Sequence, residues 1–163
     1  MSTAYIALGA NLGKRQHTLR QAIERIGKLP GTRVTAVADF RQTEPVGGPP
    51  DQPKYINSAL AVETSLPPRA LLAQLLEIER ALGRDRATQV YHGPRRIDLD
   101  LLLYEGQVIS DTSPPGGWGA LVLPHPRLHQ RRFVLEPLAQ IAPEVVHPIF
   151  GRTIRELLAA LDV

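Results

Sequence analysis

The chain has 163 residues, 43% of them hydrophobic, which suits one sizeable core, and we expect residues 1–163 to form a single domain. It contains no cysteine, which excludes disulfide bonds and thiolate metal sites and is compatible with a cytoplasmic location. The formal charge is +3, with 16 Arg against three Lys, but three Phe, four Tyr and one Trp are too few for a basic surface that stacks nucleic-acid bases. No apolar run approaches the length of a membrane span, so we expect neither a nucleic-acid nor a membrane partner.

The first half of the chain predicts three strands and two helices. A strand over 4–9 leads into Gly9-Ala10-Asn11-Leu12-Gly13-Lys14. This segment is superficially like a phosphate-binding loop, but it has three residues between its glycines where that motif needs four, so we interpret it as a turn that enters a helix. The remaining elements are that helix to about Lys28, a strand over 32–40, a Pro- and Gly-rich loop over 42–54, a strand over 55–63, and a helix over 67–82 that ends at Gly83.

The second half predicts one long strand and several shorter elements. In chain order we expect a loop over 84–92, a strand over 98–104, a hairpin through Glu105-Gly106 into 107–109, a surface excursion over 110–119, a strand over 121–123, a helix over 131–141, and a last helix over 153–161 capped by Thr153 with Glu156. The order strand, helix, strand, strand, helix, strand is that of a ferredoxin-like βαββαβ sandwich. This is an α+β fold with a mostly antiparallel sheet and helices packed on one face.

Two carboxylates, Asp98 and Asp100, lie inside the apolar strand of the second half. Residues two apart in a strand point to the same face, so these side chains project together, roughly 6.5–7 Å apart. Leu99, Leu101 and Leu103 are then expected on the opposite face, against the core. Two half-buried like charges repel each other and are expensive to desolvate, which predicts a positive partner. Because Mg²⁺ prefers carboxylate oxygens, the residues alone indicate a divalent-metal site that handles phosphate. The alternative is a solvated edge without a role.

Other polar residues give weaker signals. Asn57 shares one face of its strand with Tyr55, Ala59 and Ala61, and it is hard to explain as core because a buried unpaired amide is strongly unfavourable. The pair His125 and His129 has a spacing found in zinc sites. However, no glutamate lies between the two histidines and a proline follows the first one, so a zinc site is not favoured.

Taken together, the motifs resemble the 6-hydroxymethyl-7,8-dihydropterin pyrophosphokinase family of folate biosynthesis, nearly from end to end. The matching segments are Gly9-Ala10-Asn11-Leu12-Gly13, Thr43-Glu44-Pro45, residues 51–57, Glu79 with Gly83-Arg84, residues 93–100, and Pro124-His125-Pro126. The resemblance implies a ferredoxin-like fold and transfer of the pyrophosphoryl group of ATP to the hydroxymethyl oxygen of the pterin, giving AMP and the pterin diphosphate. It also implies small-molecule substrates only, and we expect a monomer. Because the chain ends without a second synthase domain, we expect a single activity.

The resemblance assigns roles to particular residues. Asp98 and Asp100 match the carboxylates that hold two Mg²⁺ ions bridging the triphosphate, and Arg84 and Arg95 match catalytic arginines that act on the transition state. The expected ATP contacts are Glu79, Arg86, His125 and Arg131, and the expected pterin pocket consists of Thr43, Pro45, Val46, Tyr55, Asn57 and Phe133. In this pocket Tyr55 and Phe133 would sandwich the flat ring, while the amide of Asn57 would supply a donor and an acceptor.

The chain also departs from the family pattern. His92 stands where an aromatic residue, often Trp, is usual, Tyr91 stands where a basic residue is usual, and the loop before them is one residue longer than in short bacterial members. Residues 113–119, which include Trp118, resemble an insertion. Two alternative functions are a metal-dependent phosphotransferase or phosphohydrolase with another acceptor, and a basic ferredoxin-like module that binds RNA or a protein. The first predicts a nucleophile or base beside Asp98, and the second predicts aromatics on the sheet; neither is visible.

Overall fold

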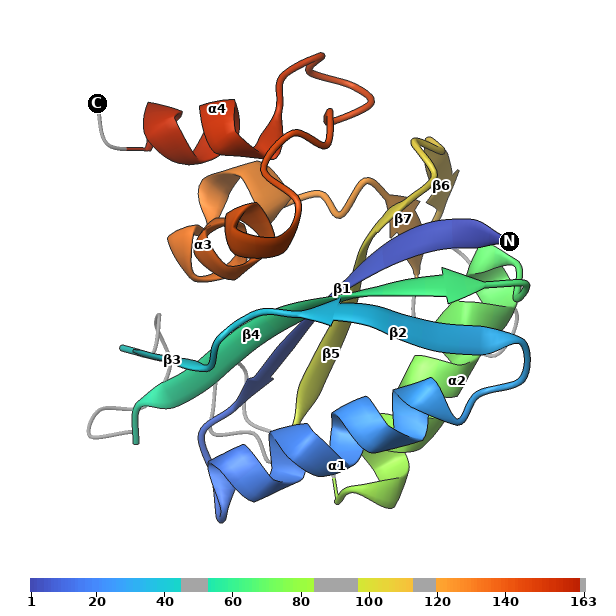
Figure 1. Ribbon diagram of the computed structural model, residues 1–163, viewed down its shortest axis with the longest axis vertical. Helices are drawn as coiled ribbons and strands as arrows, with labels where there is room; N and C mark the ends of the chain where they lie inside the picture. Colours follow the sequence, from blue (N-terminus) through green and yellow to red (C-terminus); the bar gives the residue numbers. More distant parts are fainter. Residues whose placement is uncertain (45–52, 84–96, 113–119, 162–163) are drawn as a thin grey trace.

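The computed structural model describes residues 1–44, 53–83, 97–112 and 120–161 (Figure 1). The first elements are β1 (Ser2–Ala10), α1 (Arg15–Gly27), β2 (Thr32–Val37), β3 (Arg41–Thr43), β4 (Tyr55–Thr64) and α2 (Pro68–Ala81). They are followed by β5 (Asp98–Tyr104), β6 (Ile109–Asp111), β7 (Leu121–Leu123), the 3₁₀ turn η1 (Leu128–Gln130), α3 (Arg132–Ile141) and α4 (Ile154–Ala160). No helix in these residues is long and apolar enough to cross a membrane.

The main sheet has the strand order β2-β4-β1-β5, and β3 pairs with the first three residues of β4. Every pairing in it is antiparallel. With the crossovers through α1 and α2, this order confirms the predicted βαββαβ arrangement and the α+β class. β1 lies between β4 and β5, so it connects the strand that carries Asn57 to the strand that carries Asp98 and Asp100.

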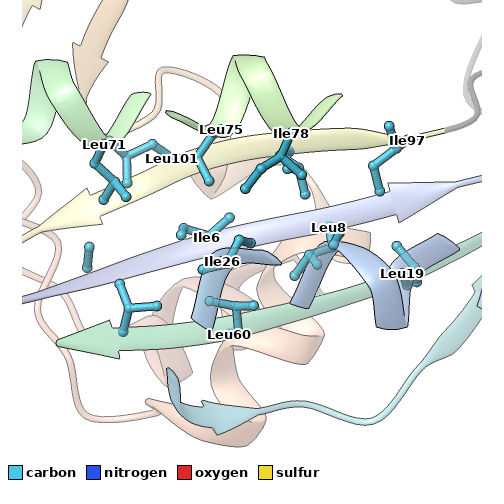
Figure 2. Close-up of a cluster of buried hydrophobic side chains, with 14 of the residues drawn as sticks. Ile6, Leu8, Leu19, Ile26, Leu60, Leu71, Leu75, Ile78, Ile97 and Leu101 are labelled. Carbon is cyan, nitrogen blue, oxygen red and sulfur yellow. The ribbon is translucent and has the colours of Figure 1, made fainter. Parts of the chain in front are cut away.

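The helices α1 and α2 pack against one face of this sheet, as the sequence predicts. Leu19 and Ile26 of α1 and Leu71 and Leu75 of α2 are fully buried. Figure 2 shows these side chains pointing at apolar residues of the strands, Ile6 among them. Burying a side chain of this size contributes about 1.5–3 kcal/mol, so this layer supplies much of the stability that holds the strands in place.

The helices α3 and α4 lie on the other face of the sheet (Figure 1). Leu128, Leu135 and Leu138 are buried there, against the small side chains of Ala7 and Ala59. The beginning of α4 has the predicted capping box, in which the side chain of its N-cap residue accepts a backbone N–H and the glutamate three residues on reaches back. Both faces of the sheet are therefore covered, while sequence order predicted helices on only one.

The strand β5 corrects one expectation about side-chain direction. Leu99 and Leu101 belong to the core beside α1 and α2, as expected, but Leu103 belongs to the cluster on the α3 and α4 side. The cause is a register shift between β1 and β5 at Tyr5 and Ile6, which inserts one extra residue in β5 and reverses the alternation beyond it. Asp98 and Asp100 precede the shift, so their shared face is unaffected.

Short strands account for the other corrections. Residues 41–43 form β3, although the sequence predicted a loop from residue 42. The turn at Glu105 and Gly106 exists, with the N–H of Gln107 donating to the carbonyl of Tyr104, but the strand beyond it is not a hairpin partner of β5. That strand, β6, includes residues 110 and 111 of the expected excursion and pairs with β7 in a separate two-stranded sheet.

Candidate active site

A cavity of about 480 Å³ opens on the face of the sheet that bears the two carboxylates. Its floor is formed by β1, β4 and β5, and its opposite wall is formed by the segment that enters α3. Its lining combines acidic, basic, aromatic and amide side chains with small residues, and consists of Ala7, Leu8, Gly9, Thr43, Glu44, Tyr55, Asn57, Asp98, Asp100, Arg127, Gln130, Arg131, Arg132, Phe133 and Val134.

The two carboxylates of β5 form one side of the cavity. Asp98 pairs with Gly9 and Asp100 with Ala7, and both aspartates are half-buried. Their oxygens therefore face a common space, with the guanidinium groups of the wall opposite. The described residues contain no group of three or more His, Cys, Asp or Glu that would form a complete protein cage for a metal. A pair of carboxylates open to a cavity instead fits Mg²⁺, which is usually held by one or two carboxylates together with substrate phosphates and water.

An aromatic and amide pocket forms the other side of the cavity. Asn57 is 7% exposed, and its side-chain oxygen accepts a hydrogen bond from the hydroxyl of Thr43. This bond explains how an amide is tolerated inside the sheet, and it turns the NH₂ group toward β1. Tyr55, which pairs with Thr43, and Phe133 of α3 also line the space. The pocket thus offers two aromatic rings and a fixed amide to a flat polar ligand.

Positive charge is concentrated on the wall of the cavity near α3. Arg127, Arg131 and Arg132 all line it. The guanidinium carbon of Arg131 lies 5.6 Å from the centre of the Phe133 ring, within the range of a cation–π contact. Arg132 pairs with Glu136 one turn along α3, at 3.4 Å. The Arg131 contact couples the basic wall to the aromatic pocket.

His125 is half-buried and is not among the residues that line the cavity. Its backbone N–H donates to the carbonyl of Leu102, and its Nδ1 accepts the backbone N–H of Arg127 at 3.2 Å. Burial lowers the pKa of His125 to about 4, with a further lowering by Arg131 and an opposing contribution from Asp98. The imidazole is therefore neutral at pH 7, and Nε2 carries its proton, so it can offer an uncharged donor.

Glu79 of α2 does not line the cavity, although the sequence places it among the nucleotide contacts. Its side chain is 1% exposed, and one of its oxygens accepts the backbone N–H of Leu99 at 2.7 Å. Leu99 stands between the two aspartates, so this bond ties α2 to the strand segment that carries them. A nucleotide contact by Glu79 stays a prediction.

The structure brings seven of the predicted site residues together in the cavity: Thr43, Tyr55, Asn57, Asp98, Asp100, Arg131 and Phe133. Pro45, Val46, Arg84, Arg86 and Arg95 lie outside the described residues, as do Tyr91, His92 and Trp118. The lining also includes residues to which the sequence gave no role in the site: Gly9, Arg127 and Arg132. Arg127 follows the Pro-His-Pro motif directly, which is a signal that could have found it. Nothing local in the sequence indicated Arg132.

The turn after β1 has a structural task. The side chain of Asn11 is 1% exposed and donates from Nδ2 to the carbonyl of Pro53 at 3.2 Å. The guanidinium of Arg15 donates to the carbonyl of Lys54. These bonds fasten the chain just before β4 to the beginning of α1, which fixes the end of β4 that bears Tyr55 and Asn57. These contacts support the interpretation of residues 9–14 as a turn that enters a helix, and none of them indicates a phosphate-binding loop.

Comparison with known proteins gives a consistent result. The sequence model of the family described as 7,8-dihydro-6-hydroxymethylpterin-pyrophosphokinase (HPPK) matches residues 5–143. A 2-amino-4-hydroxy-6-hydroxymethyldihydropteridine pyrophosphokinase of Methylorubrum extorquens is 46% identical over 163 residues, covering 99% of this chain and 95% of the relative. The protein of the same name from Bacillus subtilis is 42% identical over 142 residues, covering 87% of this chain and 79% of the relative.

Solved structures agree on the fold. The chain resembles that of wild-type Plasmodium falciparum HPPK-DHPS with pterin and p-hydroxybenzoate, with a TM-score of 0.79 at 14% sequence identity. The match covers 98% of this chain and 43% of the solved one, so the chain spans less than half the length of that protein.

Proposed function

The chain belongs to the 7,8-dihydro-6-hydroxymethylpterin-pyrophosphokinase family, and from this premise we propose how the residues of its cavity carry out the reaction. The enzyme transfers the pyrophosphoryl group of ATP to the hydroxymethyl group of 6-hydroxymethyl-7,8-dihydropterin in folate biosynthesis. In this transfer the hydroxymethyl oxygen forms a bond to the β-phosphorus, the bond from that phosphorus to the α-phosphate oxygen breaks, AMP leaves, and the hydroxyl proton is released.

One observation carries the proposal: a carboxylate pair and an aromatic–amide pocket open into the same cavity from two strands that flank β1. The first suits metal-bound phosphates, and the second suits a flat heterocycle with hydrogen-bonding edges. A phosphoryl transfer between two bound substrates needs both sites side by side, because holding the reactants in line supplies much of the rate.

We assign Asp98 and Asp100 as the ligands of two Mg²⁺ ions. Their common face, their half-burial and the open space in front of them support this assignment. When bound, such ions neutralise charge on the triphosphate and favour ionisation of the attacking hydroxyl. The aspartates themselves fix where the phosphates lie relative to the acceptor pocket.

In the acceptor pocket, Tyr55 and Phe133 hold the pterin ring between their faces. Asn57 binds the pyrimidinone edge with the amide that Thr43 orients. Arg131 occupies one side of Phe133 and also faces the cavity, so it stabilises the negative charge that grows on the transferred group while it supports the aromatic wall. Arg127 and Arg132 add to the same positive field.

The remaining assignments rest on the family resemblance. Arg84 and Arg95 are proposed to act on the transition state, with Arg86, His125 and Glu79 as further contacts to ATP. Pro45 and Val46 complete the pterin pocket. Burial keeps the pKa of the His125 imidazole low, which supports the assignment of His125 as a neutral donor through Nε2. We also propose, on the same resemblance, that residues 1–163 form one domain that acts as a monomer in the cytoplasm.

The proposal is tested by the products of the reaction. The full chain is incubated with ATP, Mg²⁺ and 6-hydroxymethyl-7,8-dihydropterin, and the nucleotides are separated by chromatography. AMP and the pterin diphosphate should appear in equal amounts and only when both substrates are present. ADP or free phosphate in place of AMP would contradict it, because either product requires attack at a different phosphorus.

A further inference from the structure

Gly9 lies at the centre of the cavity floor. It pairs with Asn57 of β4 on one side and with Asp98 of β5 on the other, and all three residues line the cavity. Neighbouring strands lie about 4.8 Å apart, so the backbones that carry the acceptor amide and the first metal carboxylate are about 10 Å from each other. Gly9 is the one residue between them in the sheet.

The backbone does not require glycine at this position. Gly9 lies within the extended strand β1 and is not among the residues with positive φ, whereas Gly13, Gly31 and Gly83 are. A glycine inside a strand weakens the strand and is found where another group approaches closely. Close neighbours of Gly9, and not its backbone conformation, therefore explain the glycine.

That space is taken by the acceptor pocket. A Cβ atom on Gly9 would lie 2.9 Å from Nδ2 of Asn57, closer than real Cβ atoms come to other atoms, and 3.7 Å from Cδ1 of Tyr55. Asn57 has little freedom to yield, because it is 7% exposed and its oxygen accepts the hydroxyl of Thr43. The clash would be relieved by rotation of the amide, which breaks the bond that orients it.

We propose that Gly9 is a specificity-determining position for the pterin. Because it has no side chain, the Asn57 amide keeps the orientation that Thr43 gives it, and the floor stays open from that amide to Asp98. A flat bicyclic ring with a short hydroxyl-bearing arm lies across this floor, with its hydrogen-bonding edge at Asn57 and its arm toward the metal carboxylates. The proposal rests on the function proposed above and adds the residue that sets the acceptor's fit.

The test compares Gly9→Ala with Gly27→Ala in the full chain. A Cβ on Gly27, at the end of α1, would meet only Cγ2 of Val34 at 3.6 Å, which is ordinary contact, so this variant controls for the substitution itself. Losing an oriented hydrogen-bonding group should raise the KM for the pterin by about tenfold or more in Gly9→Ala, with the KM for ATP unchanged. Gly27→Ala should match the wild type in both constants.

A double variant shows whether Gly9 acts through Asn57. In an Asn57→Ala background the atom that meets the new Cβ is gone, so adding Gly9→Ala should cause little further rise in the KM for the pterin. An undiminished further rise would overturn the proposal, as would an unchanged pterin KM in Gly9→Ala or an equal rise for ATP. If Gly9→Ala does not fold, thermal melting decides: Gly9→Ala/Asn57→Ala should fold, and its failure to do so would refute a clash with Asn57. A wild type without AMP production would instead refute the proposed function.

Discussion

Replacement of Asp98 by asparagine keeps the size of the side chain and removes its charge. At the roughly 7 Å separation of two carboxylates on one face of a strand, their repulsion is about 0.6 kcal/mol in water and about 2.4 kcal/mol at an effective dielectric constant of 20. Both aspartates are half-buried, and Arg131 nearby offsets part of the repulsion. Asp98→Asn should therefore leave the metal-free protein as stable as the wild type or about 1 kcal/mol more stable, a rise in Tm of about 2–4 °C.

The same change should remove most of the stabilisation that bound Mg²⁺ and nucleotide give to the folded protein. In the wild type, Mg²⁺ with an unreactive ATP analogue at about 100 times its Kd adds about 2.7 kcal/mol of stability, and in Asp98→Asn most of that gain should be lost together with turnover. Thermal melting at low salt, with and without the ligand, measures both effects. Asp39→Asn, an exposed aspartate outside the cavity, is the control and should behave as the wild type does. A large fall in the metal-free Tm, or a full ligand-induced rise with retained turnover, would refute the reasoning.

Three further predictions follow from the cavity and its supports. Phe133→Leu keeps apolar volume but loses the ring, so the KM for the pterin should rise between about twofold and about tenfold with that for ATP unchanged; steady-state kinetics with each substrate varied measures it, and equal rises would contradict it. Burial lowers the pKa of His125 to about 4, from 6.5 in the unfolded chain, so the folded protein favours the neutral imidazole. The free energy of unfolding should therefore be highest above pH 6.5 and should fall by up to about 3 kcal/mol as the pH drops toward 4. Urea unfolding across this range should show a smaller fall in His125→Gln. Glu79→Ala leaves the buried N–H of Leu99 without its acceptor and should lower the free energy of unfolding by about 1–3 kcal/mol, whereas Glu79→Gln keeps an acceptor and should lose less; equal losses would contradict this role.

The sequence predicted those parts of the fold that depend on local pattern. Alternation along 98–101 placed Asp98 and Asp100 on one face, and the order of strands and helices predicted the topology. The capping box at Thr153 could be predicted because its two residues, Thr153 and Glu156, are only three positions apart in the chain. The acceptor pocket was predicted from the family resemblance, and within it the strand pattern itself pointed only to Asn57, a polar residue on a face expected to be apolar.

The features that the sequence did not predict depend on contacts between distant segments. Leu103 faces away from Leu101 because β1 and β5 shift register, and nothing within β5 reveals its partner's register. Pairing of β6 with β7 joins two segments of three residues, too short to show a pattern. Arg132 reaches the cavity only because η1 and α3 return to the sheet. In each case the arrangement is decided by contacts between segments that are distant in the sequence, and local propensities carry no information about those contacts.

The central claim, that the carboxylate pair on β5 holds the metal ions between the two substrates, is tested most directly by counting bound ions. Mn²⁺, which replaces Mg²⁺ and is visible by electron paramagnetic resonance, is titrated into the full chain with α,β-methylene ATP and the pterin. We expect two Mn²⁺ per wild-type chain and fewer in Asp98→Asn and Asp100→Asn. Two ions bound with unchanged affinity in both variants would contradict it, because the ions would then be held elsewhere.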